Sequence, residues 1–197
     1  NPFRAVLFVV IAIPIIAQVW ADDPTCESIN AAFGAELLSD ENLWDDNPES
    51  VARRLSLRPE SKTSTDASFR KYPSSTERIF ACRPYSSTLL AEDGFPSSLS
   101  FVFANKGDAV FCTMGSSDRQ LKRLQADQIK NLQRSIRADQ QTIAQTLTSL
   151  FGEPVADRFG QGRETRENVK RWDWNGHAFL LAAPREEYVA LRIMPTE

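Results

Sequence analysis

Cysteine and histidine are the residue types in this chain that could carry nucleophilic or metal chemistry, and both are scarce. The 197 residues contain three cysteines, Cys26, Cys82 and Cys112, and one histidine, His177. A catalytic cysteine needs a base, so a Cys–His enzyme requires Cys82 or Cys112 within about 4 Å of His177. No Cys-x-x-Cys spacing occurs that would indicate a metal site. The sequence therefore predicts a protein that is not an enzyme and that has no metal site.

The remaining polar motifs lack the context that catalysis or cofactor binding requires. Asp45-Asp46 and Glu186-Glu187 are adjacent carboxylates in predicted loops, which is typical of a solvated surface. Gly160-Gln161-Gly162 lacks the strand-to-helix setting of a phosphate-binding loop, so we expect no cofactor. The formal net charge of −3 gives no electrostatic basis for a nucleic-acid partner.

Residues 1–21 are typical of a secretory signal peptide. The stretch from Ala5 to Val19 is apolar except for Gln18, and it is shorter than the roughly 20 residues of a membrane-spanning helix. Val19-Trp20-Ala21 predicts cleavage after Ala21, which would leave a periplasmic or secreted protein. An uncleaved anchor is the alternative, and it is the only membrane contact that we expect.

Export would expose the cysteines to an oxidising compartment. Cys82 and Cys112 both lie in apolar, strand-like runs and are the candidates for a disulfide. Two buried thiols are an equally good interpretation of the same pattern.

Residues 22–115 predict a helix followed by strands. Asn47 can cap a helix that starts at Pro48 and ends near Leu57. The predicted strands cover residues 68–72, 78–83 and 85–91, with a further strand through Leu99, Phe101 and Phe103 after an Asp93-Gly94 turn.

Residues 116–197 repeat this order of elements. An apolar stripe from Leu121 to Leu150 predicts a long helix that stops at Gly152, or two helices if the polar run 139–141 divides it. A loop is expected up to Arg166, followed by strands at 169–174, 177–183 and 188–194, with an Asn175-Gly176 hairpin. The predicted fold class is thus α+β, built from two tandem units of a helix plus a three-stranded antiparallel meander.

The hairpin at Asn175-Gly176 also predicts which side chains share a face. It sets Trp174 opposite His177 and Trp172 opposite Phe179. A four-residue turn at 184–187 would then place Leu180 beside Leu191. One face becomes an aliphatic core of Val169, Leu180, Val189, Leu191 and Ile193. The other face is mainly aromatic and includes Leu181, Met194 and His177. We predict a partner-binding surface on that second face, formed by Trp172, Trp174, Phe179, Tyr188 and Arg192. The alternative is that this aromatic face packs under the chain's own helices, with the first half covering the other face.

The segment 118–137 is basic, with six lysines and arginines against two aspartates. It could lie on anionic lipid or meet an acidic partner, and a solvated helix face is the simpler interpretation.

Two resemblances add expectations. The helix 143–151, Gly152-Glu153-Pro154 and Trp172-Asp173-Trp174 resemble the helix-plus-meander unit of the β-lactamase inhibitor protein and of small outer-membrane assembly lipoproteins, which bind other proteins. The runs 43–46, 60–65, 101–108 and 171–174 are similar to a family of uncharacterised exported bacterial proteins, whose longer members carry a papain-like cysteine peptidase domain.

We therefore expect an exported, non-catalytic protein-binding or accessory domain whose partner is another exported protein. The alternative is the non-catalytic N-terminal region of a secreted cysteine peptidase.

Overall fold

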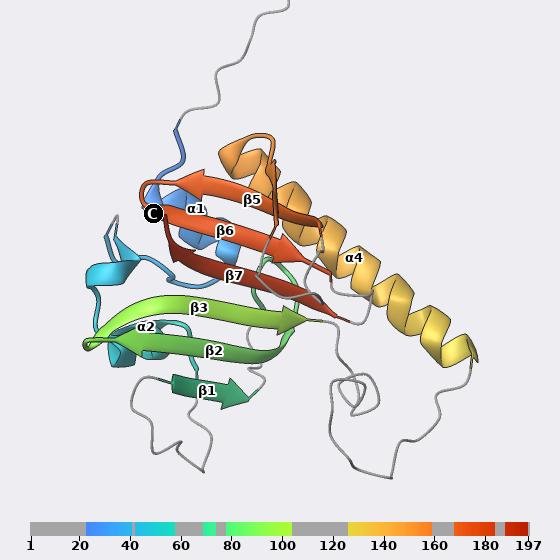
Figure 1. Ribbon diagram of the computed structural model, residues 1–197, viewed down its shortest axis with the longest axis horizontal. Coiled ribbons are helices and arrows are strands. Elements are labelled where there is room, and N and C mark those ends of the chain that lie inside the picture. Colours follow the sequence, from blue (N-terminus) through green and yellow to red (C-terminus); the bar gives the residue numbers. More distant parts are fainter. Residues whose placement is uncertain are drawn as a thin grey trace, which may run out of the picture.

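The described part of the chain folds as a layer of helices on one face of an antiparallel sheet, so the α+β class is confirmed (Figure 1). The computed structural model describes residues 23–40, 42–57, 69–73, 78–103, 126–158, 168–183 and 188–196. The helices are α1 (Cys26–Phe33), the 3-10 helix η1 (Leu43–Asp45), α2 (Pro48–Arg54) and α4 (Ala126–Phe151). The strands are β1 (Phe69–Pro73), β2 (Pro84–Glu92), β3 (Phe95–Phe103), β4 (Val155–Arg158), β5 (Asn168–Trp174), β6 (His177–Ala182) and β7 (Val189–Pro195).

The strands form one sheet in the order β1-β2-β3-β7-β6-β5-β4. Strands β1 to β3 pair in chain order, strands β4 to β7 do the same, and β3 pairs with β7 in the middle of the sheet. This pairing aligns Leu99 with Ile193 and Phe101 with Leu191. The described strands of the first half therefore extend the sheet sideways, while Val169, Ala178 and Leu180 on the second face of the C-terminal strands are buried as well.

Two tight turns set the register of their hairpins, as the sequence predicts. Asp93 and Gly94 have φ values of 52° and 87°, and Asn175 and Gly176 have values of 40° and 78°. Two consecutive residues with positive φ are what a type I′ turn requires. Trp174 accordingly pairs with His177, and Trp172 pairs with Phe179.

The predicted register between β6 and β7 is wrong by one residue. Leu181, not Leu180, pairs with Leu191, and Leu180 lies opposite Arg192. A one-residue slip moves every side chain of a strand to the other face of the sheet. The observed register therefore places Val189, Leu191 and Ile193 on the same face as Phe179 and Leu181, and the predicted aliphatic core that grouped them with Leu180 and Val169 is wrong.

The long helix α4 is continuous through the polar run that could have divided it. It covers 26 residues, and Ile136, Ile143 and Leu147 on it are fully buried. Their spacing of seven and four residues keeps them on one helix face, so the polar side chains between them lie beside the stripe without breaking it. The predicted start of this helix, before residue 126, lies outside the described residues.

The first half contains one correct helix prediction and one wrong strand. The Asn47 side chain caps α2 by accepting hydrogen bonds from the backbone N–H groups of Glu49 and Ser50. Residues 78–83 do not form a strand, because Phe80 and Ala81 adopt φ values of 49° and 60°. The sequence analysis also missed α1 and the short edge strand β4.

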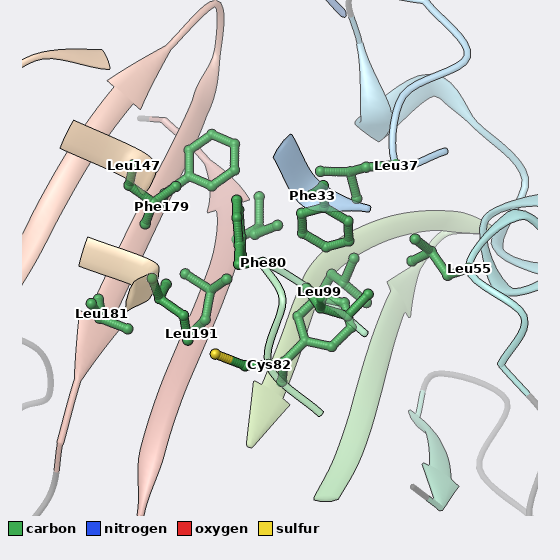
Figure 2. Close-up of a cluster of buried hydrophobic side chains, with 14 of the residues drawn as sticks. Phe33, Leu37, Leu55, Phe80, Cys82, Leu99, Leu147, Phe179, Leu181 and Leu191 are labelled. Carbon is green, nitrogen blue, oxygen red and sulfur yellow. The ribbon is translucent and has the colours of Figure 1, made fainter. Parts of the chain in front are cut away.

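The turn at residues 78–83 inserts an aromatic ring into the centre of the core (Figure 2). The Phe80 N–H donates to the Phe33 carbonyl at 3.0 Å, and the two rings meet edge to face with centroids 4.9 Å apart. Phe80 is 2% exposed. Its position between helix α1 and the sheet explains why the chain adopts left-handed backbone at two non-glycine residues.

We expect Phe80→Ala to lower the free energy of unfolding by about 3 kcal/mol or more, because it leaves a cavity among rigid neighbours. Phe95, at the start of β3, is 53% exposed, so Phe95→Ala should change stability by no more than about 0.5 kcal/mol. Urea unfolding followed by circular dichroism measures both. Equal effects of the two substitutions would contradict the placement of Phe80 in the core.

Candidate functional site

Of the five residues predicted to form the partner-binding face, Trp172 and Phe179 are buried and Trp174 is partly buried against the core. Trp172 is 2% exposed and Phe179 is fully buried, under the C-terminal end of α4. The Phe179 ring stacks on Phe151 with centroids 4.9 Å apart. Trp172 donates from Nε1 to the Gly152 carbonyl at 3.0 Å, and the half-buried Trp174 donates to the Pro24 carbonyl at 3.1 Å. These side chains connect the sheet to a helix end and to the N-terminal segment.

The other two predicted residues do not complete a single surface with them. Arg192 alternates with the buried Leu191 and Ile193, so it lies on the opposite face of β7. Its Nε donates to Ser98 Oγ at 2.8 Å, and partial burial lowers the pKa of its guanidinium. Tyr188 is half-buried just before β7. A role of these five residues in binding a partner stays a prediction, but they do not share one exposed face.

His177 is fully buried at the hairpin end of β6, with both ring nitrogens in contact with backbone groups. Nε2 accepts a hydrogen bond from the Leu43 N–H at 3.1 Å, and Nδ1 lies 2.8 Å from the Asn175 carbonyl oxygen. These partners assign a neutral imidazole with its proton on Nδ1. Burial lowers the pKa of His177 from its ordinary value of 6.5, against a smaller opposite effect of the carbonyls of Asn175 and Trp174.

Two tryptophan rings flank this imidazole. The ring centroids of Trp44 and Trp174 lie 5.3 Å and 5.6 Å from that of His177. Trp44 also donates from Nε1 to the Gly176 carbonyl at 3.2 Å. His177 thus attaches η1 to the β5–β6 hairpin, which is a structural role.

Cys82 is the described member of the predicted disulfide pair, and it is a free thiol. Its sulfur points into the core beside Leu191 (Figure 2), and it lies 4.0 Å from the Asp139 carbonyl oxygen of α4. Burial first, and then the nearby Asp139, raise the pKa of this thiol to about 12. Cys112 lies outside the described residues, so the pairing stays a prediction.

The chemistry of Cys82 and His177 does not combine into a catalytic pair. Nucleophilic cysteines are thiolates at neutral pH, which requires a lowered pKa and a nearby base. The Cys82 thiol has a raised pKa and contacts α4, while the nitrogens of His177 contact the backbone of the hairpin and of η1. Within the described residues, no three His, Cys, Asp or Glu side chains come together as a metal site.

An open groove of about 580 Å³ lies between α4 and β5. One face of the helix forms its wall through Arg137, Gln140, Gln141, Ala144, Gln145 and Thr148. Ser149, Glu153 and Lys170 complete the described lining. Lys170 and Trp172 are two residues apart in β5, so their side chains lie on the same face of the sheet. Because Trp172 is buried under α4, Lys170 also lies on the helix side.

The sequence analysis missed this groove, although it identified the basic segment beside it. The helical spacing of residues 137, 141, 144 and 148 places them on one face, but only the fold shows that β5 lies next to that face. Exposed Lys130 and Arg134 precede the groove on the same helix. The groove therefore combines amide and hydroxyl side chains with the cations Arg137 and Lys170 and the carboxylate Glu153.

Comparisons with protein-family models, with curated proteins and with solved structures found no match to this chain. Among the described residues, no helix combines the length and the apolar character needed to cross a bilayer.

The buried neutral His177 predicts a loss of stability in mild acid. Below about pH 6.5 an unfolded histidine binds a proton, whereas the folded imidazole binds it only at lower pH, so the free energy of unfolding falls as the pH decreases. In His177→Gln the amide oxygen can still accept from Leu43, and the pH dependence between about pH 7.5 and 5 should become shallower. Equilibrium urea unfolding at a series of pH values measures this. Identical slopes for the two proteins would show that His177 is not the group responsible.

Cys82 is buried and its thiol has a raised pKa, so alkylating reagents should react with it very slowly in the folded protein. Iodoacetamide at about pH 8 should label Cys82 only after denaturation, as read by peptide mass spectrometry without reductant. Rapid labelling of the native protein would contradict the burial, and a peptide linked to Cys112 would establish the disulfide instead.

Proposed function

We propose that this chain is an exported, non-catalytic protein-binding or accessory domain. The observation that carries the proposal is the groove between α4 and β5, which is open and lined by amide, hydroxyl and charged side chains. Such a concave surface with many hydrogen-bonding groups is suited to a polypeptide partner. None of the five residues of the predicted binding face is among those that line the groove, so the binding surface we propose differs from the predicted one.

The positions of His177 and Cys82 support a non-catalytic role. A general base must reach the proton that it removes, and a nucleophile must reach its substrate. His177 is fully buried and spends both nitrogens on backbone partners, while Cys82 is 6% exposed with a pKa of about 12.

Export with cleavage after Ala21 is part of the proposal, and it is compatible with the position of the first described helix, α1. Thr25 caps α1 through a capping box with Ser28. Just before it, the Pro24 carbonyl accepts the hydrogen bond from Trp174. A cut after Ala21 would therefore leave every described element intact.

We also propose that the chain consists of two helix-plus-meander units in tandem. The succession of helix and antiparallel strands in each half supports this, as does the joining of the two meanders by a single pairing, β3 with β7. The C-terminal unit has β4 as an additional strand, so the two units differ in size.

Site-specific photo-crosslinking of the exported full chain tests the binding function. A photoreactive amino acid at Gln145 in the groove should give an adduct of defined mass with another exported protein. The same amino acid at the exposed Glu92, at the far end of a hairpin, serves as the matched control and should give several-fold less of that adduct. Absence of adducts at Gln145, or the same adducts from both positions, would contradict the proposal.

A further inference from the structure

Three glutamine side chains on the helix wall of the groove have no partner. Gln140, Gln141 and Gln145 all line the groove. Within the described part of the chain, none of their amides forms a hydrogen bond or another polar contact. Each amide carries two N–H donors and one carbonyl acceptor. The wall can therefore bind a ligand that offers hydrogen-bond donors and acceptors together.

The charged residues of the groove do not select an ionic ligand. Arg137 already interacts with another group of the protein. The other two charged residues of the described lining are Lys170 and Glu153, one cation and one carboxylate, and both are exposed. Exposed charges of opposite sign largely cancel at a distance, and salt screens what is left of their field. An uncharged ligand therefore fits this groove better than an acidic or a basic one.

The groove has little apolar surface with which to hold a ligand. Ala144 is the one apolar side chain of the described lining, and it is small and buried. Sites for small molecules are lined mostly by hydrophobic and aromatic side chains, with only a few polar groups. Recognition in this groove must therefore depend on hydrogen bonds, and a polypeptide backbone supplies them in a regular row.

The spacing of two of the glutamines matches that of an extended polypeptide. Gln141 and Gln145 are four residues apart on one side of α4, which is about 6 Å along the helix. In an extended chain the N–H and C=O of one residue point to the same side, and every second residue repeats this after about 6.7 Å. One amide can thus accept from the N–H and donate to the C=O of one residue, and the other amide can do the same two residues further on.

We propose that the groove holds an extended, uncharged segment of a partner protein by its main chain, with the amides of Gln141 and Gln145 bonded to alternate residues. This inference rests on the proposed protein-binding function and names the class of ligand. From Arg137 to Ser149 the lining covers about 18 Å of helix, which about six extended residues span. Because the contacts are made to backbone groups, neutral segments of different sequence should bind alike.

Titration of the full chain with blocked six-residue peptides, followed by NMR of the nitrogen-15-labelled protein, tests this inference. One peptide alternates threonine with alanine, and the other alternates serine with valine. Both should bind with dissociation constants that agree within about threefold, and both should shift the side-chain amide signals of Gln141 and Gln145. Binding of neither peptide, or of one alone, would overturn recognition by the main chain.

Substitution of the glutamines tests the two contacts. Gln141→Met and Gln145→Met keep the length of the side chain and remove its amide. Each should weaken the binding of both peptides roughly five- to tenfold, because two hydrogen bonds are lost. Gln133→Met is the matched control, since Gln133 lies on α4 outside the described lining, and it should leave binding unchanged. The same effect at all three positions would contradict the site.

Methylation of the peptide nitrogens tests whether the groove binds the main chain itself. The N–H groups of an extended segment alternate between its two sides. Methyl groups on every second nitrogen leave one side intact, so binding should stay within about threefold. Methyl groups on every nitrogen should abolish it. Undiminished binding of the fully methylated peptide would overturn the inference.

Two further outcomes separate this inference from the proposed function. Binding of the oligosaccharide maltohexaose without peptide binding would assign the amides to sugar hydroxyls and overturn the inference. A crosslinked protein at Gln145 in the absence of peptide binding would refute only the main-chain contacts. Absence of peptide binding and of any crosslinked protein would refute the binding function as well.

Discussion

The pairing of β3 with β7 is the interaction on which the rest of this structure depends. It joins two meanders that are distant in sequence into one sheet, and it aligns Leu99, Phe101 and Phe103 with Ile193, Leu191 and Val189. One continuous apolar face results, and helices from both halves cover it. The buried residues of both halves belong to one hydrophobic cluster, so the two halves share a core.

A second connection between the halves is polar and fully buried. His177 accepts the Leu43 N–H and thereby satisfies a backbone donor of η1 that would otherwise be buried without a partner. Trp44 and Trp174 flank the ring, and the indole of Trp174 holds the N-terminal segment through Pro24. His177 and Trp174, which the sequence suggested for catalysis or binding, thus connect η1 and the N-terminal segment to the β5–β6 hairpin.

Because these aromatic residues pack against the core, the binding surface that we propose is the groove between α4 and β5. The face of α4 that lines this groove carries amide and hydroxyl side chains together with Arg137, and β5 contributes Lys170.

The sequence by itself determined the elements whose signals are local. Asn47-Pro48 fixed the start of α2, the dipeptides Asp93-Gly94 and Asn175-Gly176 fixed two hairpins, and the apolar stripe fixed α4. The tertiary structure decided what depends on distant partners: the register of β6 against β7, the turn that carries Phe80 into the core, and the groove beside Lys170. Local signals follow from the conformational preferences of one or two residues. Register, burial and edge exposure follow from which segments meet, because the burial of a shared apolar face is gained only when all of them are assembled.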